Sequence, residues 1–229
     1  MAEVIEISRL ALHDQVGARL RTMLVEGRIA PGAKLNEREL CEQLHVSRTP
    51  LREAIKLLAA EGLVDLLPNR GAVAVKLTEA DVLNTFELLA MLEGMSGELA
   101  AQRITDAALA EVRALHYEML ACFTRQDLSG YYRLNARIHE AINRAAGNPV
   151  LSQTYRAINA RVQSLRFRTN QDGAKWQRAV QEHERMVEAL ATRDAAGLRQ
   201  VLVEHLQHKR DTVLQLMRDH AGLPGSISA

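Results

Sequence analysis

Three cations recur at four-residue spacing in the stretch SRTPLREAIKLLAAEGLV, which begins at Ser47. Arg48, Arg52 and Lys56 fall on one face of the expected helix. The other face is apolar: Leu51, Ile55, Leu58 and Ala59. Arginine can hold O6 and N7 of guanine with two parallel hydrogen bonds, and a helix N-terminus attracts phosphate. A helix with cations in its first turns is therefore suited to the major groove of DNA.

Two arginines four residues apart are by themselves more often a solvated face. Arg48 and Arg52 have Glu42 and Glu53 nearby in sequence as partners for surface ion pairs. The motif around them is much longer than two arginines, and it favours a nucleic-acid surface.

Three histidines form a second set of residues that could bind a metal or take part in catalysis. His183 and His205 each fall within the apolar stripe of an expected helix, whereas Asn135 and His139, one turn apart, flank the same edge of the stripe of theirs. Three imidazoles and one amide oxygen suit a borderline divalent metal, zinc or nickel, with room for a further ligand. Alternatively, each histidine is a satisfied core residue, because one imidazole in an apolar stripe is common.

The acids near these histidines bear on a third alternative, a metal-dependent enzyme that activates water. Four glutamates adjoin a histidine in sequence and are expected to point to other faces: Glu140, Glu182, Glu184 and Glu204. His208 is likewise expected to point away from the apolar stripe of its helix. Without an acid beside the histidines, enzymatic hydrolysis is disfavoured.

Composition sets the broad class. The chain has 229 residues, a net charge of +1, 47% hydrophobic and 3% aromatic residues, enough for two domains with apolar cores. Cys41 and Cys122 follow no metal or redox spacing, which favours a reducing cytosol. The sequence shows no secretory signal and no run of about 20 apolar residues. We therefore expect a cytoplasmic protein without a membrane partner.

The first 77 residues are predicted to form a winged helix-turn-helix domain. Apolar spacing predicts a helix from Leu12 to Gly27, a second over 36–44 with Asn36 as its cap, and a third that ends at Gly62. Two short strands then flank a turn at 68–71. Arg70 and Gly71 at the tip suit a wing, because a cation stands beside a residue that lets the backbone approach a sugar-phosphate closely.

The remainder is predicted to be all helical. Six helices are expected over 79–102, 106–124, 128–145, 149–170, 174–192 and 195–218, with Thr78 as the first cap. The fold class is therefore mainly α, a winged helix-turn-helix followed by an all-α six-helix bundle. The bundle domain spans 78–222, and 223–229 is expected to be a flexible tail.

The N-terminal motif resembles the DNA-binding domain of the GntR family of bacterial transcriptional regulators. The matching stretches are PGAKLNEREL, VSRTPLREAIKLLAAEGLV and PNRGAVAV. The resemblance implies contacts to bases and phosphates from the positions that match the family's motif: Arg38, Ser47, Arg48, Thr49, Arg52 and Gly71.

The helical region resembles the effector-binding domain of the FadR-type subgroup, and its six helices resemble the VanR-like branch. The relevant stretches are NARIHEAINRAAGNPVL, EHERMVEAL and VEHLQHKRD. In metal-binding members the matching positions hold the ion, which here implies Asn135, His139, His183 and His205. Leu89 stands where the family often has an arginine, so the pocket is expected to lack that cation.

The resemblance implies a ligand-responsive regulator, most often a repressor, that binds a palindromic operator in double-stranded DNA as a homodimer. Members of the subgroup commonly sense small carboxylates. Arg161 and Arg166, which flank the apolar stripe of their helix, are the candidate partners of such an organic acid. A regulator that responds to the metal alone remains an alternative.

Overall fold

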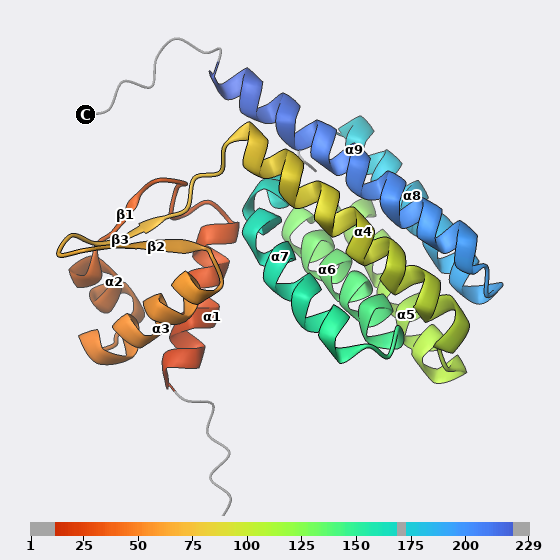
Figure 1. Cartoon of the computed structure of the whole chain (residues 1–229), viewed down its shortest axis with the longest axis horizontal. Helices are drawn as coiled ribbons and strands as arrows, with labels where there is room; N and C mark the ends of the chain where they lie inside the picture. Colours follow the sequence, from red (N-terminus) through yellow and green to blue (C-terminus); the bar gives the residue numbers. More distant parts are fainter. Residues whose placement is uncertain (1–11, 169–172, 222–229) are drawn as a thin grey trace, which may run out of the picture. The chain divides into compact units, whose positions relative to one another are not determined.

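The computed structural model describes residues 12–168 and 173–221. The chain divides into two compact units, one ending at Lys76 and the other beginning at Leu77 (Figure 1). Each unit has its own apolar core. The described ranges contain nine helices and one small sheet. This mainly helical architecture confirms the predicted fold class. The expected tail over 223–229 lies outside the described residues.

Three helices and a three-stranded sheet make up the described part of the N-terminal unit. They are α1 (Leu12–Val25), α2 (Glu37–Leu44) and α3 (Arg48–Ala60). The Asn36 side chain caps α2 by accepting hydrogen bonds from the backbone N–H groups of Arg38 and Glu39. His45 ends α2 in the left-handed conformation (φ 52°), which turns the chain sharply into α3. The apolar face of α3 is buried beside α1.

The sheet supplies the wing. β2 (Val64–Leu67) and β3 (Gly71–Ala74) form the antiparallel hairpin that the sequence predicts, with Leu67 opposite Gly71 at its tip. Gly71 has φ +85°, a conformation that favours glycine. The two-residue strand β1 (Lys34–Leu35), which the sequence did not predict, pairs with β3, so the strand order is β1-β3-β2.

Over the residues that the structure describes, the C-terminal unit is a bundle of six helices whose bounds lie within three residues of the predicted ones. Thr78 opens it with a capping box, in which its side chain and that of Asp81 bond to each other's backbone N–H. Thr105 and Asp127 cap the next two helices. The helices are α4 (Glu79–Arg103), α5 (Asp106–Thr124), α6 (Leu128–Ala145), α7 (Pro149–Arg168), α8 (Gly173–Ala191) and α9 (Ala195–Ala221).

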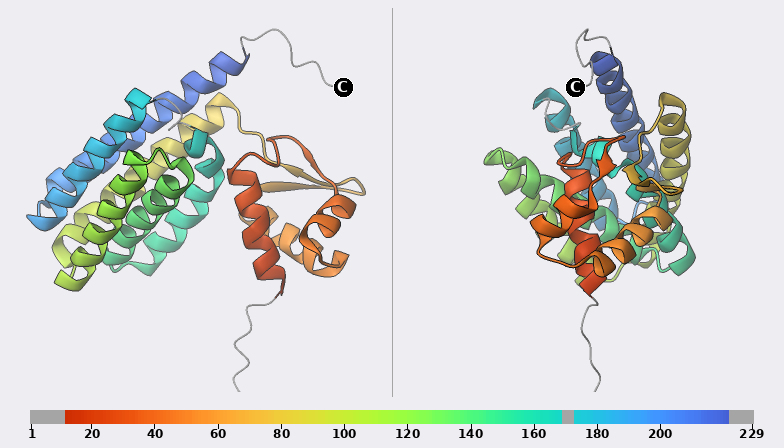
Figure 2. Two further views of the ribbon diagram at one scale, coloured as in Figure 1. Left: turned by 180° about the vertical axis from the view of Figure 1, so that it is seen from behind. Right: turned by 90° about the vertical axis from the view of Figure 1, so that its left-hand side faces the viewer.

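Two long helices, α4 and α9, lie side by side in every view (Figure 2). Two glycines permit this close packing. A Cβ atom added at Gly97 would overlap Leu202 and lie 3.0 Å from Cγ of Leu198, and one at Gly94 would lie 2.9 Å from Cγ2 of Val203. The close approach holds the middle of α4 against the segment of α9 that carries His205. Among the described helices, none is long and apolar enough to cross a membrane.

Candidate functional site

The residues expected to contact DNA share one property, which is that all of them are exposed in the N-terminal unit. Ser47 occupies the N-cap position of α3, but its side chain makes no capping hydrogen bond. Its hydroxyl is therefore available to another partner at the helix N-terminus. The seven exposed residues are Arg38, Ser47, Arg48, Thr49, Arg52, Arg70 and Gly71.

Arg52 has a partner that the sequence did not indicate. Its guanidinium lies 2.9 Å from the carboxylate of Glu37 at the start of α2, rather than beside Glu42 or Glu53. Glu53 instead pairs with Lys56 at 2.9 Å. Exposed ion pairs contribute about 0.2–1 kcal/mol, so a phosphate or a base edge can displace Glu37 at low cost.

Inside the helical unit, three helices bring three imidazoles together. His139 on α6, His183 on α8 and His205 on α9 are buried, and one ring nitrogen from each lies within 4.8 Å of the others. Their ring centroids are 5.1–5.3 Å apart. Asn135 is also buried, one helical turn before His139. These are the four residues that the sequence singled out for a metal.

Several ring nitrogens of this cluster have no hydrogen-bond partner among the described residues. They are Nε2 of His139, both nitrogens of His183 and Nε2 of His205. Buried polar atoms without partners are uncommon in folded proteins, and a metal ion that accepts their lone pairs would satisfy them. The donor set of the cluster therefore fits a divalent ion.

Burial keeps two of these imidazoles neutral, the form that binds metal. It lowers the pKa of His183 far below its usual value, and the neighbouring His139 and His205 lower it further. Burial also lowers the pKa of His205 strongly, with added effects from His139 and Lys209. Neutral imidazoles keep a lone pair for coordination at ordinary pH.

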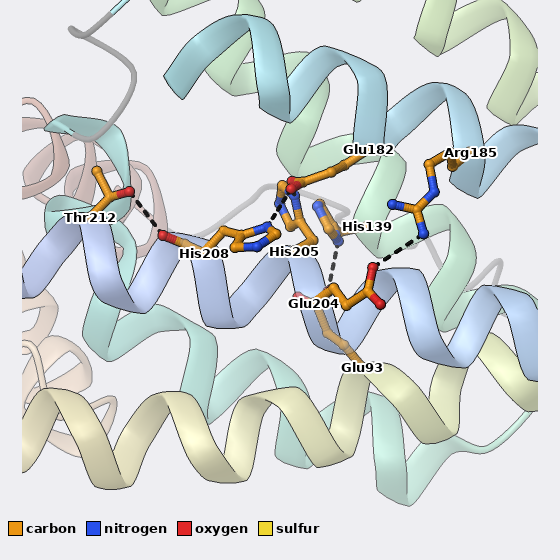
Figure 3. A network of polar contacts seen from close by, with 8 residues as sticks. All are labelled: Glu93, His139, Glu182, Arg185, Glu204, His205, His208 and Thr212. Atoms are coloured by element: carbon orange, nitrogen blue, oxygen red, sulfur yellow. Dashed lines mark hydrogen bonds and ion pairs between the residues drawn. The ribbon is translucent and has the colours of Figure 1, made fainter. Parts of the chain in front are cut away.

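Two buried glutamates contact the cluster, contrary to the expectation that no acid accompanies it. Glu93 on α4 lies 2.9 Å from Nδ1 of His139, and Glu182 on α8 lies 2.6 Å from Nδ1 of His205 (Figure 3). Burial would raise the pKa of Glu93, but His139 and Arg166 outweigh it and hold this pKa at about 2. The expectation for Glu182 was wrong because the buried face of α8 is wide enough to include two consecutive residues, Glu182 and His183.

His208 also departs from expectation. It is exposed, as its position on α9 suggested, yet its Nδ1 lies 2.6 Å from the second oxygen of Glu182. Glu140, Glu184 and Glu204 do not contact the cluster. Glu140 pairs with Arg156 and Glu204 pairs with Arg185, while Glu184 is exposed.

Comparisons with known proteins agree with both units. Residues 12–73 match the bacterial regulatory proteins of the gntR family, and residues 84–208 match the FCD domain. The Nta operon transcriptional regulator of Aminobacter aminovorans is 32% identical over 205 residues, which cover 86% of this chain and 91% of that protein. The chain belongs to the GntR family.

Two further proteins are similar to this GntR regulator, one in sequence and one in fold. The galactonate operon transcriptional repressor of Escherichia coli is 28% identical over 208 residues, covering 82% of this chain and 90% of the relative. The solved structure of E. coli McbR/YncC has a TM-score of 0.82 at 23% identity and covers 91% of this chain and all of that one, which shows the fold. The family consists of transcriptional regulators, so the function is regulatory rather than enzymatic.

The two arginines proposed for an effector lie in different surroundings in this GntR regulator. Arg161 is exposed, whereas Arg166 is buried, 3.7 Å from Glu93 and 2.6 Å from the side-chain oxygen of Asn159. The structure does not bring the two arginines together, because five residues along a helix separate them by well over a quarter turn. Only Arg166 lies beside the histidine cluster, through Glu93.

Leu89 is fully buried in the core formed by α4, α7 and α9. Two buried cations lie elsewhere in the bundle, Arg166 on α7 and Lys209 on α9. Burial and the nearby Arg166 lower the pKa of Lys209 to about 7, although Glu182 acts in the opposite direction.

Proposed function

We propose that this GntR regulator is a repressor whose DNA affinity is controlled by a small carboxylate at a divalent metal centre in the helical unit. The main support for the metal is a set of buried ring nitrogens on His139, His183 and His205 that have no hydrogen-bond partner within the described ranges. These three residues would hold zinc or nickel, with Asn135 as an oxygen ligand. The bound ion would supply an open coordination position for a carboxylate oxygen.

The proposed effector is a small organic acid. The galactonate operon repressor, a relative of this chain, is named for a sugar acid, which supports this class of ligand. Arg166 is the candidate for a second contact, because its guanidinium is buried near the histidines and offers a fork to a carboxylate. Arg161 is exposed and has less support in this role.

We place the dimer contact on an exposed apolar stripe of α4. Leu83, Leu88, Met91 and Met95 are 42–57% exposed in the single chain, although all are large and apolar. Contiguous apolar surface on a helix is typical of protein interfaces. A two-fold dimer formed there would bind a palindromic operator, since each subunit would read one half-site.

On DNA, α3 would enter the major groove and the β2–β3 wing would contact the backbone. Arg48, Thr49 and Arg52 stand in the first turns of α3, where base edges are read, while Arg38, Ser47, Arg70 and Gly71 suit phosphates and sugars. Such a regulator would act in the cytoplasm, beside the DNA.

Native mass spectrometry of tag-free protein, purified without chelator, tests the proposal directly. We expect a dimer with one divalent ion per chain, and loss of the ion in His183→Ala. The mass of a co-purified acid would identify the effector. A metal-free wild-type protein would refute the metal centre and leave DNA binding untouched.

A specific observation favours a second candidate, in which the metal alone is the signal. Arg166 already contacts Glu93 and Asn159, so an effector carboxylate would have to compete with both. Fluorescence anisotropy with operator DNA separates the two possibilities. Affinity that changes with zinc alone, and not further with galactonate or similar acids, would support the metal-only regulator.

A further inference from the structure

We propose that Glu182 and His208 form a positioning pair that fixes the tautomer and orientation of His205 for metal binding. This inference rests on the proposed metal centre and assigns roles to two residues outside its ligand set. The Glu182 carboxylate is shared: one oxygen lies 2.6 Å from Nδ1 of His205 and the other 2.6 Å from Nδ1 of His208.

The hydrogen bonds determine which nitrogen of His205 is free. An ionised carboxylate only accepts hydrogen bonds, so Nδ1 of both histidines must carry the hydrogen. In neutral His205 the lone pair then lies on Nε2, which has no hydrogen-bond partner among the described residues and belongs to the ring packed beside His139 and His183. Glu182 therefore presents Nε2 of His205 to the cluster.

The other two histidines lack an equivalent arrangement. Glu93 contacts Nδ1 of His139 at 2.9 Å, but its other oxygen faces the guanidinium of Arg166 rather than a second histidine. Neither ring nitrogen of His183 has a hydrogen-bond partner within the described parts of the chain. His205 is thus the member of the cluster whose acid is shared with a second histidine.

His208 fixes the far side of the same carboxylate. Its side chain is 45% exposed, whereas that of Glu182 is only 6% exposed. His208 also lines a surface pocket of about 430 Å³ between α8 and α9, together with Lys175, Arg178 and Thr212. Figure 3 shows Glu182 reaching from α8 to both histidines, separate from the Arg185–Glu204 pair. Without His208, one oxygen of Glu182 would lose its donor and the carboxylate could rotate away from His205.

Alternatively, Glu182 has a purely structural role, as a buried acid that accepts hydrogen bonds from two nearby donors. The two interpretations differ in what happens to metal affinity. Groups that orient a metal-bound histidine change affinity about 10- to 100-fold when they are removed. A merely structural acid would change the stability of the metal-free protein and leave zinc affinity per folded molecule unchanged.

The test measures zinc affinity of the full chain by competition with a chromophoric chelator, and records visible spectra with Co²⁺. We expect Glu182→Met to lower zinc affinity about 10- to 100-fold and to change the Co²⁺ bands. Glu182→Gln, which can still accept from His205, should lose less. Glu184→Gln is the matched control, because Glu184 is an exposed acid two residues along the same helix; it should behave as wild type.

Substitutions of His208 provide a second test, which does not require replacing a buried residue. His208→Ala should lower zinc affinity several-fold, and His208→Gln, whose amide can still donate to Glu182, should restore most of it. In a Glu182→Met background, His208→Ala should have no further effect, because the two residues act through one path.

The outcomes separate the two proposals. Unchanged zinc affinity and Co²⁺ spectra in both Glu182→Met and His208→Ala would overturn the positioning pair and leave the metal centre intact. If Glu182→Met does not fold, equal affinities of wild type, His208→Ala and His208→Gln would overturn it. A wild-type protein that binds neither ion would remove the proposed metal centre and this inference with it.

Discussion

Replacing His183 with leucine should have opposite effects on stability with and without metal. In the folded chain His183 is fully buried, and neither of its ring nitrogens has a hydrogen-bond partner in the described parts of the chain. A buried polar group without a partner destabilises the fold by about 1–3 kcal/mol. His183→Leu removes that penalty with a side chain of similar size, so the metal-free variant should be more stable by about 1–3 kcal/mol.

With zinc the order should reverse or the gap should close. A ligand at 100 times its dissociation constant stabilises the folded state by about 2.7 kcal/mol. The wild type should gain this stability, and His183→Leu should gain little, because it lacks one of the three imidazoles. In a chain of this length 1 kcal/mol corresponds to a Tm change of about 2–4 °C.

Thermal melts in EDTA and in excess zinc measure both effects. His116→Leu is the matched control, since His116 is also buried with a partnerless Nδ1 but lies outside the cluster. It should stabilise the metal-free protein and keep the full zinc response. Two results would refute the reasoning: a metal-free His183→Leu less stable than wild type by more than 1 kcal/mol, or a Tm increase with zinc equal to that of wild type.

Four further substitutions test other features. Lys209→Met should stabilise the protein by a few kcal/mol below pH 7, because the pKa of this lysine is about 7 in the folded state and about 10.5 in the unfolded state. Between these two pH values the unfolded wild-type chain binds one more proton than the folded one, so wild-type stability rises with pH. The stability difference between Lys209→Met and wild type, measured by urea titration, should therefore shrink by about 1.4 kcal/mol per pH unit over that range. Gly97→Ala should destabilise the bundle by about 1–3 kcal/mol, because the added Cβ overlaps side chains of α9. The higher helix propensity of alanine offsets up to about 1 kcal/mol of this loss, and urea unfolding measures the net change. Met91→Glu should shift the dimer toward monomer in light scattering without changing the helical content, and an unchanged mass would exclude this face of α4. Arg52→Ala should weaken binding to a specific operator by about 1–3 kcal/mol in anisotropy titrations, and an equal loss on random DNA would show that Arg52 contacts only phosphate.

Most of the fold could be predicted from the sequence because its helix boundaries are marked by local chemistry. Thr78, Thr105 and Asp127 are capping residues that act within a single turn, and Asn36 caps α2 in the same way. The strand β1 was missed because two residues carry no periodicity, and its partner β3 lies more than thirty residues away.

The site was harder to predict because its acids are recognised only through tertiary contacts. Helical spacing could find His139, since it lies at the edge of the apolar stripe of its helix, one turn after Asn135. The same spacing misjudged Glu182, because adjacent residues on a helix are both buried where neighbouring helices cover a wide face. Glu93 meets His139 and Arg166 from two other helices, and no local pattern on α4 indicates that meeting.

The length and placement of α4 have a mechanical consequence. Three residues separate the end of β3 at Ala74 from the cap at Thr78, so a short linker connects the wing to this helix. Glu93 stands about 21 Å along α4 from its first residue, at 1.5 Å per residue. If α4 pivots about its first turn as a rigid helix, a displacement of about 1 Å at Glu93 tilts the helix by about 3°. A ligand that displaced Glu93 at the proposed metal centre would therefore tilt the helix to which the DNA-binding unit is covalently attached.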